Sequence, residues 1–399
     1  MGGASRARAL ALLGAGIIVA ACGSRPTPTT GPSAGAATAM ATGAAPTTAV
    51  AATLDPAAFN AMAFETISGA PLSSAEGGKL QAALERLADG AGATATVLSQ
   101  RGTWSGATGL LDGVHPMTID AQFAIGSMGK SVIAAQVMQL VEAGEISLDD
   151  PVSNRLADNL GFDTNHASIR QLLGMRSGIP DVIPALDPLL NADPKHLWSA
   201  EEVLALTPKT RTPPGTAFDY SGTNYLLLGL AIEHVRGRAV GEVLRDGVFK
   251  VQGAKRLISQ PFEAPTAPIA IPDGAPADYL KLSGGFLSSA AQVSADAYAG
   301  AMASDAPSLG QWWRALCAGE LVSQASLTTM STMVDDYGLG LYVFDVPGAV
   351  GHGGLGFNNE YSTLAGCIPA TGVVFVVLAN RDVDVSAIAN ALIDALPPS

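Results

Sequence analysis

Residues 123–130 read Phe-Ala-Ile-Gly-Ser-Met-Gly-Lys, and this stretch decides both the fold and the chemistry to be expected. An apolar pattern from Ser127 to Ala143, ended by Gly144, predicts a helix that begins at the serine. Residues three apart lie on one helix face, with Cβ atoms about 5–6 Å apart. Lys130 is therefore predicted to lie beside the Ser127 hydroxyl, at the helix end that favours developing negative charge. A partly buried lysine there can accept the hydroxyl proton.

A Ser-x-x-Lys pair is weak evidence when it stands alone. The chain has seven lysines, so about half a match is expected by chance at ordinary serine frequency. The alternative is a serine that caps a helix, followed by a lysine that faces solvent. The pair gains weight only if other segments of the chain support it.

The order of the predicted elements indicates one mixed α/β domain. A Ser-x-x-Glu capping box at residues 73–76 begins an early helix. A β-hairpin follows it, residues 165–345 contain mostly helices and loops, and strands with a final helix close the chain. We therefore expect an antiparallel sheet built from both chain ends, flanked by helices, with an inserted helical region. The predicted strands are 94–100, 103–109, 337–344, 360–365 and 372–380, and the last helix is 383–396.

Composition excludes several classes of partner and cofactor. The 399 residues are 48% hydrophobic and 14% charged, and the net charge is −13. Nucleic acid is not expected as a partner, because phosphate binding needs clustered Lys and Arg. The three cysteines form no CxxC and no Cys/His cluster with zinc-ligand spacing, so we expect no metal and no cofactor.

The N-terminus has the pattern of an export signal. Arg6 and Arg8 precede a short apolar run, which ends in Val-Ala-Ala before Cys22. This arrangement resembles the bacterial lipobox, in which the cysteine is lipidated and becomes the new N-terminus. It predicts a signal peptide over 1–21, a Thr/Ala/Pro-rich disordered tether over 22–54 and a folded domain over 55–399. The protein would then be exported and anchored by lipid to the outer face of the cell membrane, in the cell envelope. The alternative is an ordinary secretory signal with an incidental cysteine.

Export also bears on the other two cysteines. In an oxidising compartment Cys317 and Cys367 can form a disulfide. Two buried free thiols are the alternative.

Two further segments support the Ser-Lys pair. Residues 211–229 read Arg-Thr-Pro-Pro-Gly-Thr-Ala-Phe-Asp-Tyr-Ser-Gly-Thr-Asn-Tyr-Leu-Leu-Leu-Gly, and residues 351–356 read Gly-His-Gly-Gly-Leu-Gly. With them the chain resembles the serine β-lactamase and D-alanyl-D-alanine carboxypeptidase (penicillin-binding protein) family, in its class C-like branch with related esterases. That family has Ser-x-x-Lys, then Tyr-x-Asn, then Lys/His-Thr/Gly-Gly on a strand. Other similar segments are 140–152, 169–180, 283–289 and 378–381, so the resemblance covers residue 80 onward.

The resemblance implies a β-lactamase/transpeptidase-like fold and a role for each matching residue. Ser127 would attack a carbonyl and form an acyl-enzyme, while Lys130 and Tyr220 share the acid/base work. His352 would hold a substrate carboxylate or relay protons to Tyr220. The backbone N–H groups of Ser127 and Leu355 would form the oxyanion hole, worth roughly 2.7–4 kcal/mol for each donor. Gly353 and Gly354 would let the strand approach a small-molecule or peptide substrate closely.

The sequence departs from the family at two places. The second motif has Gly222 where the family has an asparagine that binds the substrate's amide side chain. The third motif has Gly353 where a threonine often contacts a carboxylate. Both changes weaken the expected recognition of D-alanyl peptides and β-lactams. They leave the nucleophile, the bases and the oxyanion donors in place, so small activated esters are expected to react faster than β-lactams.

Two other classes of protein remain as alternatives. An α/β-hydrolase needs Gly-x-Ser-x-Gly, but Ile125 stands where the first glycine should be. A catalytically silent lipoprotein of the same fold would bind an envelope ligand or partner, and the two glycine changes favour it. The retention of the serine, lysine, tyrosine and histidine together favours the enzyme.

Overall fold

The computed structural model of the protein describes residues 62–358 and 360–396. The predicted signal peptide, Cys22 and the tether lie outside the described residues, as does the predicted start of the domain at residue 55. In the described part of the chain, no helix combines the length and the apolar character that a membrane span requires.

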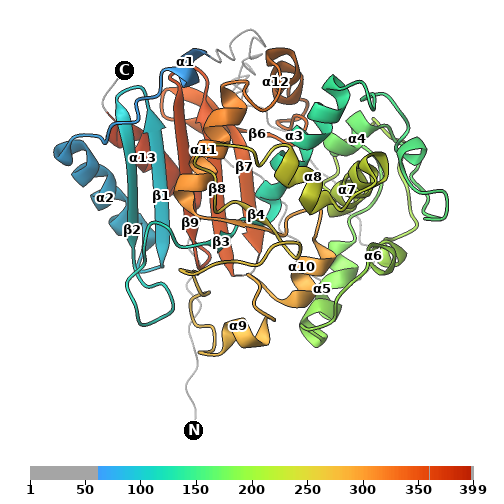
Figure 1. Ribbon diagram of the computed structural model, residues 1–399, viewed down its shortest axis with the longest axis horizontal. Coiled ribbons are helices and arrows are strands. Elements are labelled where there is room, and N and C mark those ends of the chain that lie inside the picture. Colours follow the sequence, from blue (N-terminus) through green and yellow to red (C-terminus); the bar gives the residue numbers. More distant parts are fainter. Residues whose placement is uncertain (1–61, 359, 397–399) are drawn as a thin grey trace, which may run out of the picture. The chain divides into compact units, whose positions relative to one another are not determined.

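One antiparallel sheet of six strands organises the folded unit, and both ends of the described chain contribute to it (Figure 1). In spatial order its strands are β2 (Gly102–Thr108), β1 (Ala93–Ser99), β9 (Val373–Ala379), β8 (Tyr361–Ile368), β7 (Ala349–Asn358) and β6 (Tyr342–Val346). The hairpin strand β1 pairs directly with β9 from the end of the chain. Strands β1, β8 and β9 are buried along their whole length, because both faces of the sheet are covered.

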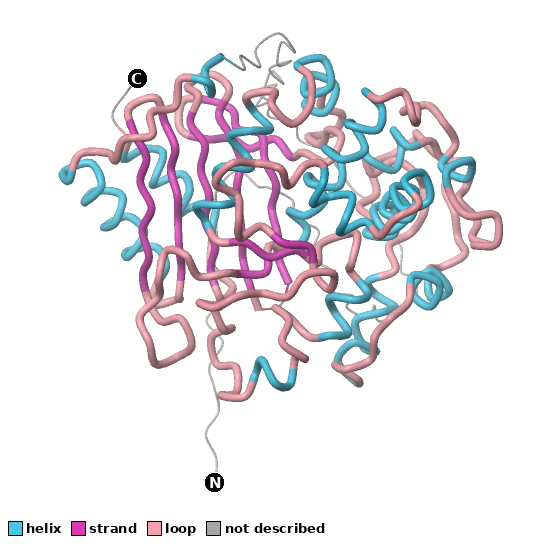
Figure 2. Tube along the Cα trace, viewed as in Figure 1, coloured by secondary structure: helices cyan, strands magenta, loops and turns pink. Residues whose placement is uncertain are grey.

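Helices form a layer on each face of this sheet (Figures 1 and 2). On one face, α2 (Ser74–Ala88) and α13 (Val385–Ala395) pack against each other and against the strands through one apolar cluster. On the other face, α11 (Ala306–Cys317) lies across β1, β8 and β9. The predicted capping box is present at the start of α2, where Ser73 and Glu76 satisfy each other's backbone N–H groups.

The inserted helical region lies beside the sheet (Figure 2). Its two central helices, α3 (Gly129–Glu142) and α7 (Gly222–Arg236), pack together and are apolar around most of their circumference, as buried helices are. The other helical elements are α1 (Met62–Glu65), η2 (Gly126–Met128), η3 (Val152–Arg155), α4 (Ile169–Leu173), α5 (Ile183–Ala192), α6 (Ala200–Leu206), α8 (Val240–Asp246), α9 (Tyr279–Leu282), α10 (Ala290–Ala295) and α12 (Gln324–Ser331).

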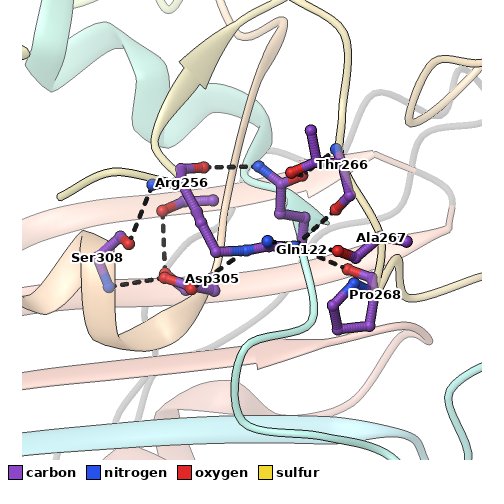
Figure 3. Close-up of polar contacts among 8 residues, drawn as sticks. Gln122, Arg256, Thr266, Ala267, Pro268, Asp305 and Ser308 are labelled. Atoms are coloured by element: carbon purple, nitrogen blue, oxygen red, sulfur yellow. Dashed lines mark hydrogen bonds and ion pairs between the residues drawn. The ribbon is translucent and has the colours of Figure 1, made fainter.

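A small second sheet, which the sequence did not lead us to expect, leads directly to the Ser-Lys motif. Its order is β3 (Phe123–Ala124), β5 (Met302–Ser304) and β4 (Ile258–Ser259). Gln122, just before β3, accepts the Thr266 N–H at 2.6 Å and donates to the Arg256 carbonyl at 2.7 Å (Figure 3). The Arg256 guanidinium in turn contacts the buried Asp305 carboxylate at 3.4 Å and donates to the Thr266 carbonyl. This network fixes the strand that positions Ser127.

Two predicted elements have different bounds from those expected. Ser127 lies in the 3-10 turn η2 and the α-helix begins at Gly129, two residues later than predicted. The predicted strand 337–344 was placed too early, since β6 begins only at Tyr342. Gly340 explains the second difference, because its φ of 78° turns the chain onto α3, where Ser131 Oγ donates to the Gly340 carbonyl at 2.7 Å. The hairpin, β8, β9 and α13 were predicted to within about three residues.

Candidate active site

Ser127 lies at the junction of the small sheet and the central helix α3. The preceding Gly126 has a φ of 54°, a left-handed conformation that favours glycine. The Ile125 N–H donates to the Met302 carbonyl at 2.9 Å, which holds the turn against β5. The hydroxyl is thus presented from a turn that a backbone hydrogen bond holds against β5.

Two other residues predicted for the site meet the hydroxyl of Ser127. Lys130 Nζ donates to Ser127 Oγ at 3.0 Å, and the Tyr220 hydroxyl donates to the same oxygen at 2.8 Å. Lys130 Nζ also lies 5.2 Å from the centre of the Tyr220 ring. Ser127 and Lys130 are three residues apart in the chain, whereas Tyr220 is 93 residues from Ser127, just before α7. Two groups that can exchange protons therefore contact the Ser127 hydroxyl oxygen.

Burial changes the acidity of the lysine. The Lys130 side chain is only 5% exposed, and this burial lowers the pKa of its ammonium to about 8. The carboxylates of Asp296 and Asp181 oppose the shift, because negative charge nearby favours the ammonium. Burial also raises the pKa of Asp296 to about 6 and raises that of Asp181. The lysine can therefore release and take up a proton near neutral pH.

A tight turn after α10 supports the lysine from the other side. Lys130 Nζ donates a second hydrogen bond to the Ala299 carbonyl at 2.9 Å. The Asp296 carbonyl closes this turn by accepting the N–H groups of residues 299, 300 and 301. A Cβ at Gly300 would lie 3.0 Å from the Gly126 carbonyl carbon, so the turn packs directly beneath the nucleophile.

The second motif lies at the start of α7. Tyr220 precedes α7, and Gly222 is the first residue of that helix. The Gly222 N–H donates to Asp181 Oδ1 at 3.0 Å. Asn224 does not substitute for the missing asparagine, because it is fully buried and its Oδ1 accepts the Ser177 hydroxyl at 2.6 Å. The carboxylate of Asp181 thus lies next to the place where the family's amide side chain would begin.

Strand β7 carries the third motif and lies against the nucleophile turn. A Cβ at Gly356 would lie 1.9 Å from the Ile125 carbonyl oxygen, and one at Gly354 would lie 2.8 Å from Met128 Cγ. A Cβ at Gly353 would lie 2.2 Å from the Ala365 carbonyl oxygen on β8. These three glycines therefore allow close packing of β7 against its neighbours. Direct contact of Gly353 and Gly354 with a substrate stays a prediction.

The predicted oxyanion donors come from adjacent elements. A Cβ at Gly126 would lie 3.1 Å from the Phe357 backbone nitrogen, so the turn before Ser127 touches β7 two residues beyond Leu355. β6 pairs with β7 only from Ala349 to Gly353 in the described sheet, so Leu355 lies beyond that pairing. That the backbone N–H groups of Ser127 and Leu355 together form an oxyanion hole stays a prediction.

His352 is buried within the sheet, with 5% of its surface exposed. Its cross-strand neighbours are Val343 on β6 and Cys367 on β8. Burial lowers the pKa of its imidazole to about 4. At neutral pH the ring is uncharged, so it cannot attract a substrate carboxylate as a cation, although it can donate or accept a proton.

A disulfide joins Cys317, at the end of α11, to Cys367 on β8. It closes a loop across 50 residues of sequence, and that loop contains β6 and β7. Cys22, the predicted lipidation site, lies outside the described residues.

Sequence reasoning missed three residues that contribute to the site. Asp296 and Asp181 set the charge around Lys130, and Ala299 accepts its second hydrogen bond. Ala299 is 169 residues from Lys130 in the chain, and Asp296 is three residues before Ala299. A single aspartate in a loop has no periodicity or spacing that would mark it.

The fold and this Ser-Lys-Tyr arrangement define a serine hydrolase. The sheet with helices on both faces, the inserted helical region and the serine at their junction are the architecture of the β-lactamase/transpeptidase-like fold. The profile of the family described as Beta-lactamase matches residues 80–396. The chain belongs to this family.

Comparisons with known relatives agree with this assignment. Penicillin-binding protein 4 of Amycolatopsis lactamdurans is 30% identical over 290 residues, which cover 68% of this chain and 75% of that protein. A D-aminopeptidase of Brucella anthropi is also 30% identical, over 35% of this chain but only 27% of its own length.

Solved structures show the same architecture. A D-stereospecific amidohydrolase from Streptomyces sp. has a TM-score of 0.67 and 25% identity, covering 80% of this chain and 99% of its own. A D-amino acid amidase from Ochrobactrum anthropi SV3 has a TM-score of 0.70 and 22% identity, covering 81% and 98%. At this identity the second likeness concerns the fold.

Proposed function

We propose that this protein is an exported, lipid-anchored hydrolase that cleaves small esters and amides through an acyl-enzyme on Ser127. One observation carries the catalytic part of the proposal. The Ser127 oxygen receives hydrogen bonds from both Lys130 Nζ, at 3.0 Å, and the Tyr220 hydroxyl, at 2.8 Å. A silent binding protein would have no physical need to bury a lysine beside a serine, since burying a cation is costly.

The three groups can carry the proton through the acylation step. Lys130, with its pKa lowered to about 8, loses its proton and then accepts the Ser127 proton as Oγ bonds to the substrate carbonyl carbon. Tyr220 donates its proton to the leaving oxygen or nitrogen as the acyl bond breaks, and Lys130 returns a proton to Tyr220. Water then attacks the acyl carbon and gives a proton to Lys130. The bond from that carbon to Ser127 Oγ breaks, Oγ takes the proton back from Lys130, and the acid is released.

The backbone supplies the electrostatic part of the reaction. The N–H groups of Ser127 and Leu355 would bind the oxyanion of the tetrahedral intermediate, and the contact of the turn before Ser127 with β7 supports this role. A neutral His352 supports a proton-relay role better than a role in holding a carboxylate, because its pKa is lowered to about 4.

The substrate class follows from what the second motif lacks. Gly222 has no amide side chain that could hydrogen-bond the acylamino group of a peptide or a β-lactam. A small ester or amide does not need this interaction, so we expect it to be the better substrate. The relatives named D-aminopeptidase and D-stereospecific amidohydrolase support amides of D-amino acids as a second set of substrates.

The decisive experiment is hydrolysis of p-nitrophenyl butyrate by residues 55–399, beside a Ser127→Ala control. The rate should fall to background in the control, and D-alanine p-nitroanilide and a cephalosporin should be compared under the same conditions. Equal rates in both proteins would refute the acyl-enzyme on Ser127. Faster turnover of the cephalosporin than of the ester would refute the proposed substrate order.

The lipid anchor needs a separate test. The full-length protein, expressed in a bacterium with a lipoprotein pathway, should partition into the detergent phase of Triton X-114. A Cys22→Ala variant should partition into the aqueous phase. Aqueous partitioning of the unmodified protein would refute the anchor without affecting the hydrolase.

A further inference from the structure

Tyr220 lies in a segment without regular structure, so its position depends on contacts made by the residues around it. Both of its neighbours in the chain, Asp219 and Ser221, are hydrogen-bonded to one residue, Met175, on the loop that follows α4. The Asp219 N–H donates to the Met175 carbonyl at 2.8 Å, and the Ser221 N–H donates to the Met175 sulfur at 3.4 Å. Met175 therefore holds the chain on each side of the tyrosine.

The same sulfur accepts a second hydrogen bond. Asn224 Nδ2 donates to Met175 Sδ at 3.5 Å, while the other end of that amide accepts the Ser177 hydroxyl at 2.6 Å. The Asn224 and Ser221 side chains have no exposed surface, so water does not compete for these groups. The N–H of Ser221 lies just before α7, where backbone donors lack partners within the helix. A thioether is a weak acceptor, yet here it serves two buried donors.

The backbone of Met175 is itself held in a less favourable conformation. Its φ is 57°, in the left-handed region that costs a residue with a side chain about 1–2 kcal/mol. Met175 is fully buried, and its N–H donates to the Leu172 carbonyl at 3.2 Å. This conformation directs the carbonyl toward Asp219 and the side chain toward Ser221, so that one residue reaches both sides of Tyr220.

We propose that Met175 is the positioning residue for Tyr220, and that its sulfur is needed for this role in addition to its bulk. The proposal rests on the proposed function, because it assigns Met175 a part in the proton transfer of that reaction. By fixing Asp219 and Ser221, Met175 keeps the tyrosine hydroxyl 2.8 Å from Ser127 Oγ. A small displacement of a catalytic group lowers the rate of the chemical step more than it weakens substrate binding.

The test is a Met175→Leu variant of the full-length protein. Leucine keeps nearly the same volume and the backbone carbonyl bond, but it leaves the Ser221 N–H and the Asn224 amide without their acceptor. With p-nitrophenyl butyrate we expect kcat to fall at least about tenfold and KM to change less than about twofold. Met138→Leu, at a buried methionine on α3, is the matched control and should keep the wild-type kcat.

A second variant separates the acceptor from the packing. Met175→Gln restores an acceptor oxygen at a similar reach and should recover kcat to within about threefold of the wild-type value. Circular dichroism confirms which variants are folded, and if the leucine variant does not fold, the glutamine variant decides. A folded Met175→Leu protein with wild-type kcat, or a folded Met175→Gln protein as inactive as Ser127→Ala, would overturn the role of Met175. An unreactive wild-type protein would overturn the proposed function itself, and the role of Met175 with it.

Discussion

The disulfide between Cys317 and Cys367 allows a quantitative prediction about stability. It joins α11 to the central strand β8 across 50 residues of sequence. A cross-link stabilises a protein chiefly by restricting its unfolded chain, and a loop of this length corresponds to about 4 kcal/mol. For a folded unit of roughly 340 residues, this free energy corresponds to a melting temperature about 6 °C higher than that of the reduced protein.

The comparison is made on one polypeptide, so that packing does not change. Residues 55–399 are melted with and without dithiothreitol, and alkylation followed by mass measurement confirms the state of both cysteines. Reduction breaks the cross-link but leaves both sulfurs in the core, so the difference in melting temperature measures the cross-link alone. A Cys317→Ala/Cys367→Ala variant is the control and should melt at the same temperature in both buffers.

Two results would refute this reasoning. If the reduced wild-type protein melts within about 1 °C of the oxidised protein, the cross-link does not restrict the unfolded chain as assumed. If both cysteines of the native, unreduced protein react with the alkylating reagent, the bond is not formed in solution.

Three other predictions concern the active site. Because the lowered pKa of Lys130 is about 8, kcat/KM should rise roughly tenfold per pH unit below pH 8 and level off above it. Asp296→Asn removes a negative charge that favours the ammonium, so the midpoint should move to lower pH; a midpoint that stays or rises would contradict the assignment to Lys130. Gly222→Asn places a Cβ 3.3 Å from Asp181 Oδ1, a tight contact that a small shift of this side chain relieves, and it should raise kcat/KM for nitrocefin about tenfold; an unchanged ratio of nitrocefin to ester turnover would count against the role given to this position. Gly356→Ala places a Cβ 1.9 Å from the Ile125 carbonyl, so ester hydrolysis should fall about 100-fold, and a fully active variant would show that this contact does not position the nucleophile turn.

Local patterns in the sequence predicted the regular elements well. The hairpin β1–β2, the buried strand β9 and the final helix α13 all lie within about three residues of their predicted bounds. These elements have clear signals, namely alternation or continuous apolar runs between turn residues. The prediction for 337–344 was wrong in its bounds, because a chain turn at Gly340 that docks onto α3 cannot be seen in a short apolar run.

The small sheet β3-β5-β4 was missed for a related reason. Its strands have two or three residues each and come from three distant parts of the chain. No window of sequence is long enough to show periodicity over so few residues. The sheet exists because Gln122, Arg256 and Asp305 join the segments through hydrogen bonds and an ion pair (Figure 3).

By itself the sequence predicted the Ser127–Lys130 pair, whose side chains the structure brings together, and the order of the hairpin, the helical region and the C-terminal strands and helix. The three motifs, taken together through their resemblance to a family, also indicated the tyrosine and the histidine. These features depend on residues close together in the chain or on motifs with a fixed order. Only the tertiary structure decided the electrostatic surroundings of Lys130 and the support of Tyr220. These surroundings and this support come from Asp181, Asp296, Ala299 and Met175, which are close to the site only in the folded chain. The strength of an electrostatic or hydrogen-bonding contact depends on distance and burial, and neither can be read from a residue's place in the sequence.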